Sequence, residues 1–364
     1  MKKTRLIILF GLLTLGLLIS ACAGGRTQTT SWPGLTVDPD GEVGYVASGT
    51  QVYAVNLVNG TEKWRFPAES DNNITFYAPP ALTDDGQLIV GGYNSLLYSL
   101  NPENGQQNWV WDGADPSQRY VAGPLADSDQ IYAPSSDKNL YSFDMNGSLL
   151  WTYTTEDALW GTPTKDGEVV FLPGMDHSVY ALNAQTGRLI WKTDPLGGSV
   201  AANPTLNPDG QLYVGTFNNE LLSLNSENGQ INWRMPAANW VWSGPTQDGG
   251  TLYVGDLEGN FYSVDAETGT IVWKIQPDPD NESAIVEKPL VLGDTVYFTS
   301  ENGSLYAVDA ANGNPLWSKE VGGKLYAGPQ AGAETILVAP LNADELLVAF
   351  DPNGVQKWVF IPAE

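Results

Sequence analysis

The stretch Ser263-Val-Asp265-Ala-Glu-Thr268-Gly269-Thr-Ile-Val-Trp273 decides the fold of this chain. A short β-branched and aromatic strand ends at Asp265, a tight turn ends at Gly269, and Trp273 follows that glycine by four residues. Aspartate can accept hydrogen bonds from the backbone of such a turn, and glycine tolerates its positive φ. The small Ser263 leaves a flat place on the strand where an indole can lie. The segment therefore predicts a hairpin that carries a docked tryptophan.

The four-residue step from glycine to tryptophan recurs eight times along the chain. The gaps between successive tryptophans are 45, 42, 40, 42, 40, 44 and 41 residues. A period of about 40–45 residues accommodates four short strands and their turns, which is one blade of a β-propeller. We expect all eight to dock neighbouring blades onto one another: Trp64, Trp109, Trp151, Trp191, Trp233, Trp273, Trp317 and Trp358.

Prolines recur in the same phase, at positions 33, 80, 124, 163, 204, 245, 289 and 329. Proline lacks the N–H of a ladder donor, so it belongs at an edge strand, here the innermost strand of each blade. In the sixth unit we expect this strand over 240–246 and its turn over 247–250. The sequence thus predicts an all-β, eight-bladed propeller over residues 32–364, with four antiparallel strands per blade. Whether the ring closes by strand exchange is left open.

The N-terminal region has the pattern of a lipoprotein signal. Basic residues precede an apolar stretch over 6–19, and Ile19-Ser-Ala-Cys22 has the small residues of a lipobox. We expect residues 1–21 to be removed, Cys22 to be lipidated, and 22–31 to be a polar tether. An ordinary secretory signal or an uncleaved anchor is the alternative, although the stretch is short for a membrane span.

Such an anchor would hold the protein at a membrane on its extracytoplasmic side. Ala23 follows the cysteine in place of the aspartate that commonly favours inner-membrane retention. In a bacterium with two membranes, we therefore expect the outer membrane, facing the periplasm. In a bacterium with one membrane, the protein would face outward from the cell membrane.

The composition restricts the partners of the chain. The chain has 17 Lys and Arg residues against 42 Asp and Glu residues, and three of the basic residues lie in the signal, which leaves 14 and a formal charge of −28 after it. Nucleic acid and anionic headgroups would be repelled, so we expect no nucleic acid and membrane contact only through the lipid. Cys22 is the single cysteine, so no intramolecular disulfide can form.

The glycine-to-tryptophan repeat resembles the tryptophan-docking motif of the pyrroloquinoline quinone (PQQ)-like β-propellers, over essentially all of the chain after the signal. Two branches of that superfamily are relevant: the quinoprotein alcohol dehydrogenases and the lipid-anchored BamB-type propellers. Resemblance to the BamB type implies a non-enzymatic scaffold. Its implied partner is an outer-membrane insertase or its client proteins, with the chain as a monomer within a complex. A shared fold does not choose between the branches.

Resemblance to the dehydrogenases would imply PQQ, calcium and a disulfide between adjacent cysteines, which this chain cannot form. Asp278, Asp280 and Glu282 alternate as calcium ligands can, but the remaining ligands of a calcium loop do not follow. His177 lies in an expected hairpin turn and offers no histidine-based triad. We expect no catalytic residue, no metal and no cofactor. A PQQ-like ligand-binding propeller and a quinoprotein dehydrogenase remain the alternatives.

A further pattern lies three residues before each proline. The even-numbered units carry an aromatic residue there, and the odd-numbered units do not. One interpretation is packing between blades by alternating large and small residues. The other is an aromatic funnel, rimmed by acidic connections, that binds a peptide or a cationic small molecule. The candidate residues are Tyr77, Trp160, Trp242 and Tyr326.

Overall fold

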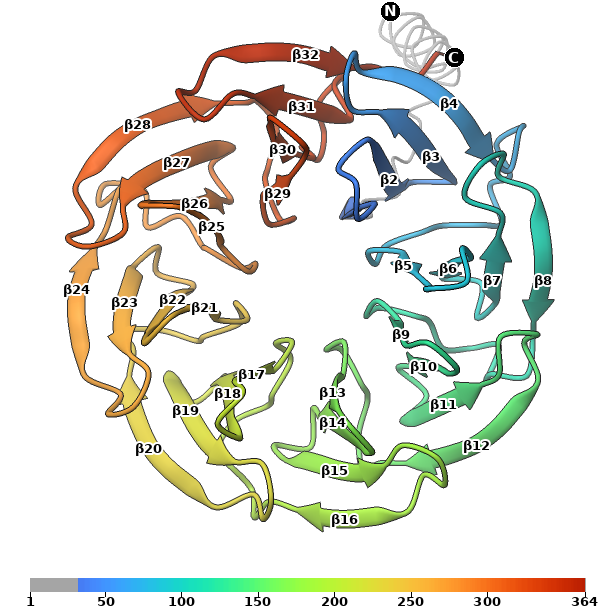
Figure 1. Ribbon diagram of the computed structural model, residues 1–364, viewed down its shortest axis with the longest axis horizontal. Coiled ribbons are helices and arrows are strands. Elements are labelled where there is room, and N and C mark those ends of the chain that lie inside the picture. The colour runs from blue at the N-terminus through green and yellow to red at the C-terminus, as the bar shows by residue number, and fades with distance from the viewer. Residues whose placement is uncertain (1–31, 364) are drawn as a thin grey trace, which may run out of the picture.

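The computed structural model describes residues 32–363, which form eight four-stranded antiparallel sheets arranged around one axis (Figure 1). The predicted eight-bladed all-β propeller is confirmed. No helix occurs in this range, and so none that could cross a membrane. Residues 1–31, including the predicted signal, Cys22 and tether, lie outside the described residues.

Each blade consists of four strands that are consecutive in the chain, with the first strand innermost and the fourth outermost (Figure 1). From the first blade to the eighth, the strands are β1 Gly34–Val37, β2 Val43–Ser48, β3 Gln51–Asn56 and β4 Thr61–Phe66; β5 Ala81–Leu82, β6 Leu88–Gly91, β7 Leu97–Leu100 and β8 Gln107–Trp111; β9 Leu125–Ala126, β10 Ile131–Pro134, β11 Asn139–Phe143 and β12 Leu149–Thr154; β13 Thr164–Asp166, β14 Val169–Pro173, β15 Val179–Asn183 and β16 Leu189–Lys192; β17 Thr205–Leu206, β18 Gln211–Thr216, β19 Glu220–Asn225 and β20 Ile231–Pro236; β21 Thr246–Asp248, β22 Thr251–Gly255, β23 Phe261–Asp265 and β24 Ile271–Ile275; β25 Leu290–Leu292, β26 Thr295–Ser300, β27 Ser304–Asp309 and β28 Pro315–Glu320; β29 Gln330–Ala331, β30 Ile336–Val338, β31 Leu347–Phe350 and β32 Gln356–Phe360.

The innermost strand of the sixth blade begins later than the sequence predicts. Strand β21 starts at Thr246, directly after Pro245, and its pairing of Asp248 with Thr251 leaves a two-residue turn. The expected strand over 240–246 is wrong because this segment crosses from the outer strand of one blade to the axis. In all eight blades, the proline in phase immediately precedes the innermost strand. Each proline thus avoids a ladder position.

The eight tryptophans predicted to dock blades all make the same contact. Each lies on the outermost strand opposite a serine or alanine of its own blade, as Trp273 lies opposite Ser263. Each indole N–H donates to a backbone carbonyl in a turn of the next blade, at distances of 2.8–3.1 Å. In the fifth blade, Trp233 and Tyr213 both donate to the carbonyl of Ala266. The motif therefore links neighbouring blades.

The ring closes without strand exchange, because blades one and eight each contain their own four strands. The seam between them is held by noncovalent contacts only. The indole of Trp358 donates to the carbonyl of Leu57 at 3.0 Å, and the guanidinium of Arg65 donates to the carbonyl of Ala363 at 2.8 Å. An apolar cluster that includes Val55 and Leu347 fills the space between the two sheets.

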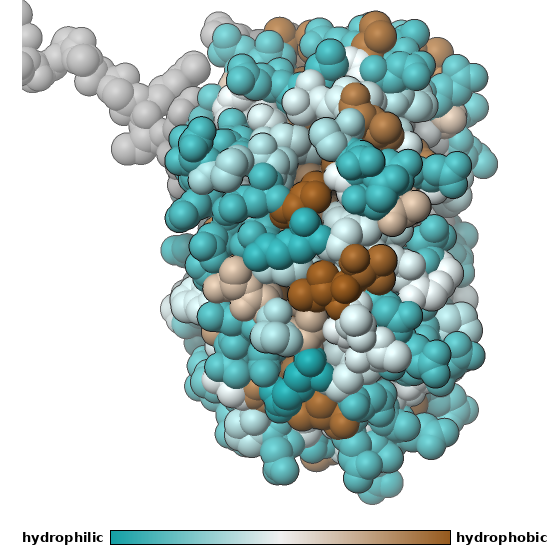
Figure 2. All heavy atoms as spheres, turned by 90° about the vertical axis from the view of Figure 1, so that its left-hand side faces the viewer, coloured by the Kyte–Doolittle hydropathy of each residue, from teal (hydrophilic) through white to brown (hydrophobic). Residues whose placement is uncertain are grey.

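The hydrophobic core is divided among the blade interfaces. Eight apolar clusters are each built from residues of two adjacent blades. The outer wall is mixed in polarity, with scattered apolar residues among polar ones (Figure 2). Exposed apolar residues on the outermost strands include Ile271 and Val272 of β24 and Leu316 of β28. Burial between blades makes each blade depend on its neighbours.

Replacing Gly269 with alanine is expected to destabilise the ring. Gly269 has a φ of +71°, and an added Cβ would lie 2.6 Å from ring atoms of Trp233. Backbone strain and the clash together predict a loss of about 2–4 kcal/mol in unfolding free energy, measured by urea denaturation. Gly249→Ala is the matched control, since its φ is +52° but its Cβ would meet nothing within 4 Å. Equal losses in the two variants would contradict the docking role of Gly269.

Candidate ligand site in the axial cavity

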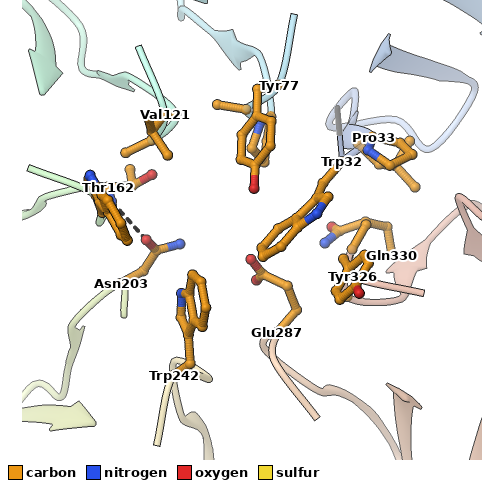
Figure 3. A pocket seen from close by; sticks show the side chains of 18 residues that line it. Trp32, Pro33, Tyr77, Val121, Thr162, Asn203, Trp242, Glu287, Tyr326 and Gln330 are labelled. Atoms are coloured by element: carbon orange, nitrogen blue, oxygen red, sulfur yellow. Dashed lines mark hydrogen bonds between the residues drawn. The ribbon is translucent and has the colours of Figure 1, made fainter. Parts of the chain in front are cut away.

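A cavity of about 100 Å³ lies where the connections to the innermost strands converge on the propeller axis (Figure 3). Every blade contributes to its lining. The contributing residues, in blade order, are Trp32, Tyr77, Val121, Trp160, Asn203, Trp242, Glu287 and Tyr326. All four aromatic residues predicted from the proline phase are among them. The structure thus brings together side chains that lie up to 294 residues apart in the sequence, Trp32 and Tyr326.

The aromatic rings of the axial cavity contact one another. Trp32 stacks on Tyr326 with ring centroids 4.3 Å apart and an interplanar angle of 11°. Its ring also lies 5.3 Å from Tyr77 and 5.4 Å from Trp242, both tilted. Trp160 stacks on Trp242 at 6.5 Å. The sequence pattern missed Trp32 because it lies one residue before its proline, whereas the predicted aromatics lie three residues before theirs.

Glu287 points into the middle of the axial cavity (Figure 3). Among the 18 residues that line the cavity, it is the only charged one. Its carboxylate accepts a hydrogen bond from the backbone N–H of Lys288 at 3.2 Å, and no other described residue donates to it. Because burial disfavours the charged form, the pKa of Glu287 is raised from 4.5 to about 7. The site therefore contains an unpaired, half-buried acid.

A sequence signal for Glu287 exists in the repeat. The position two residues before each proline is held by serine, alanine or glycine in the other seven units. Glu287 is the single departure from small residues there. Comparing the eight units at this position would have found it, whereas the search for aromatic residues could not.

Charged side chains near the rim of the axial cavity already have ion-pair or hydrogen-bond partners within the protein. The Tyr326 hydroxyl donates to Glu301 at 2.7 Å, and Glu301 forms an ion pair with Lys324. Among the acidic connections, Glu156 pairs with Lys192 at 2.6 Å. The Asp115 carboxylate accepts from the backbone and hydroxyl of Ser117. Glu301 and Glu156 are thus paired with lysines, whereas Asp115 has hydrogen bonds but no cation in this set of contacts.

The weak calcium candidates do not assemble into a site. Asp278 accepts hydrogen bonds from the side chains of Asn281 and Asn302, at 2.8–3.1 Å. Within residues 32–363, no group of three or more His, Cys, Asp or Glu side chains could hold a metal ion, so Asp280 and Glu282 add no further ligands. His177 is exposed in a hairpin turn with a φ of +69°.

The axial cavity does not fit the quinone that the dehydrogenase branch would require. Its volume of about 100 Å³ is smaller than the roughly 150 Å³ of a cavity that holds a single benzene ring. PQQ is a three-ring molecule that carries several carboxylates. No lysine or arginine lines the cavity, and Glu287 would repel an anion. We therefore assign no quinone chemistry to this cavity.

The eight tryptophan-docked blades around an axial cavity define the chain as a PQQ-like β-propeller. A family model matches it over nearly its whole length, in overlapping segments 23–172, 146–239, 175–290 and 280–362. The chain belongs to that family, which is described as outer membrane protein assembly factor BamB.

Individual relatives span both branches of the superfamily. The chain is 26% identical over 167 residues to outer membrane protein assembly factor BamB of Burkholderia pseudomallei, covering 44% of this chain and 42% of the relative. It is 27% identical over 184 residues to tetrathionate hydrolase of Acidithiobacillus ferrooxidans, covering 43% and 36%. It is 28% identical over 173 residues to the dehydrogenase subunit of the quinone alcohol dehydrogenase of Gluconacetobacter polyoxogenes, covering 44% and 21%. The chain thus matches less than half the length of each of these relatives.

A solved structure extends the likeness in fold. BamB from Moraxella catarrhalis superimposes with a TM-score of 0.69, covering 84% of this chain and 92% of the other, at 17% sequence identity. At this identity, the match supports the propeller architecture alone.

Proposed function

We propose that this chain is a lipid-anchored, extracytoplasmic scaffold that binds protein partners in outer-membrane protein assembly. The observation that carries this proposal is the family match, which runs from residue 23 to residue 362 and includes all eight blades. The printed description of that family concerns assembly of outer-membrane proteins. The expected partners are an outer-membrane insertase or its client proteins, and the chain is expected to be a monomer within that complex.

The geometry supports a binding role more than an enzymatic one. Catalysis usually needs several titratable groups arranged around a reacting atom. The axial cavity presents one carboxylate among aromatic, apolar and uncharged polar side chains, without a charged partner. Relatives with enzymatic names match only part of their own length, so their activities do not transfer with the fold. A quinoprotein dehydrogenase is accordingly the weaker candidate.

Co-purification from native membranes tests the proposal. The full chain is cross-linked in cells, solubilised in a nonionic detergent and recovered through a C-terminal tag. We expect an outer-membrane insertase or nascent β-barrel proteins to be enriched at least tenfold over an unrelated tagged lipoprotein. Enrichment of a cytochrome or of respiratory components instead would overturn the scaffold role and favour the dehydrogenase branch.

Cys22→Ser provides the control for the anchor. If Cys22 is lipidated, this variant no longer incorporates labelled palmitate and leaves the membrane fraction. Its propeller should remain folded, because Cys22 precedes every described strand. Retention of the label in this variant would contradict the lipoprotein assignment without affecting the proposal about partners.

A further inference from the structure

We propose that the axial cavity is a binding site for an organic ammonium group, held by the faces of Trp32, Trp242 and Tyr77 and by the carboxylate of Glu287. This inference is independent of the scaffold role above. The same chemistry is offered by a small quaternary or primary amine and by a lysine side chain of a peptide. No catalytic step is involved.

Aromatic rings form part of the lining of the axial cavity. The faces of aromatic rings carry a negative electrostatic potential, and a cation within about 6 Å of a ring centroid is attracted to it. Trp32 lies between Tyr77 and Trp242, with centroid separations of 5.3 and 5.4 Å and interplanar angles of 31° and 51°. Trp32 is thus the central ring of an aromatic cluster that lines the cavity. An ammonium group on the axis, beside this cluster, would lie against the rings of Trp32, Tyr77 and Trp242.

The axial cavity carries one negative charge when Glu287 is ionised. Glu287 is its only charged lining residue, and its carboxylate points to the middle of the cavity, next to the ring of Trp32 (Figure 3). The ammonium of Lys288, the next residue, forms no ion pair with it within the described structure, and Lys288 does not line the cavity. A half-buried carboxylate without a counter-ion is unfavourable unless a cation is supplied. A bound ammonium group would supply it.

Two of the protein's own cations already contact aromatic rings near the axial cavity. Arg119 lies 5.0 Å from the ring of Tyr93, which stacks behind Tyr77 at 5.1 Å. Lys324 lies 5.7 Å from the ring of Tyr326, which stacks behind Trp32. Tyr93 does not line the cavity, whereas Tyr326 does. Neither Arg119 nor Lys324 lines the cavity, so neither supplies a counter-ion to Glu287 there.

The size of the axial cavity selects the ligand. A volume of about 100 Å³ holds only a few non-hydrogen atoms. It suits the head of an alkylammonium ion, with any longer chain extending toward the open side. Exclusion of bulk water strengthens both the attraction to the rings and the attraction to the carboxylate. A neutral molecule of the same shape would gain neither.

Isothermal titration calorimetry at pH 8 tests the inference, using the full chain in a nonionic detergent. The probes are tetramethylammonium, n-butylammonium as a mimic of a lysine side chain, and 2,2-dimethylpropanol as a neutral molecule of similar shape. We expect saturable binding of at least one cation, with the neutral molecule at least tenfold weaker. The preferred cation narrows the source: tetramethylammonium points to a quaternary amine, and butylammonium points to a primary amine such as a lysine side chain.

Variants place the binding in the axial cavity. Glu287→Gln should weaken binding at least tenfold, and Trp242→Leu should weaken it severalfold. Glu227→Gln is the matched control, because it removes an exposed carboxylate from a turn outside the cavity. No saturation with either cation, or equal affinity in the Glu287 and Glu227 variants, would overturn the inference; Glu287→Gln keeps the test decisive if Trp242→Leu does not fold.

Discussion

Trp358→Ala is expected to open the propeller at its seam, whereas the same change at Trp151 is expected to leave the ring cooperative. Both indoles are partly exposed, and both donate to a carbonyl of the next blade, at 3.0 and 2.9 Å. Each change should therefore remove about 3 kcal/mol of unfolding free energy, the low end for aromatic-to-alanine substitutions in cores. The two sites differ in connectivity. Blades three and four are joined by the chain, but blades one and eight meet only through noncovalent contacts.

Urea unfolding followed by two probes, intrinsic fluorescence and far-UV circular dichroism, distinguishes the outcomes. Trp151→Ala should give coincident transitions, as expected of a single cooperative unit. Trp358→Ala should give transitions that separate, because the terminal blades can then unfold before the rest. Amide hydrogen exchange should accelerate in β2, β3, β30 and β31 of the seam variant. Coincident transitions and uniform exchange in both variants would contradict this role of the seam.

The fold could be predicted from the sequence because its signal is local and repeated. The glycine-to-tryptophan step and the phased prolines each require only a few adjacent residues, and eight copies make them unambiguous. The start of β21 was mispredicted because the segment from Trp240 to Pro245 has the extended, aromatic-rich composition of a strand. Its crossing between blades depends on the positions of two sheets, which composition does not encode. Closure without strand exchange likewise had no local signal.

The axial site was predictable where it follows the repeat and missed where it departs from it. Tyr77, Trp160, Trp242 and Tyr326 share one phase with the prolines, so their convergence follows from the ring symmetry of a propeller. Trp32 and Glu287 occupy other phases and belong to single blades. A side chain that occurs once in eight units gives no periodic signal, although its departure from the small residues of the other units is visible.

Glu287→Gln is expected to make the protein more stable at pH 8 than the parent, and to have little effect at pH 4. Burial raises the pKa of Glu287 to about 7 in the folded protein, from 4.5 in the unfolded chain. Between these values, the folded state binds more protons than the unfolded state, so the stability of the parent falls as pH rises from about 4.5 to about 7. The full shift corresponds to at most about 3 kcal/mol, and to less where water in the cavity solvates the carboxylate.

The groups that face Glu287 support this sign. Tyr326 lines the cavity from the neighbouring eighth blade and Tyr77 from the second blade; burial raises the pKa of both hydroxyls, which remain neutral below pH 8. Lys288 is the nearby cation, and burial lowers its pKa, so it offsets the penalty only in part. Urea denaturation of parent and variant at half-unit steps from pH 4 to pH 8 measures the difference. A difference that is constant with pH would contradict the buried carboxylate.

Glu301→Gln provides a control of opposite sign at the rim of the same cavity. The ion pair with Lys324 and the hydrogen bond from Tyr326 lower the pKa of Glu301. Its contribution to stability is therefore present above the unfolded pKa and lost as pH falls, so Glu301→Gln should destabilise the protein at pH 8. Adding an ammonium ligand separates the two acids further. At pH 8 it should raise the stability of the parent and of the Glu301 variant, because it binds the folded state through ionised Glu287, and leave the Glu287 variant unchanged.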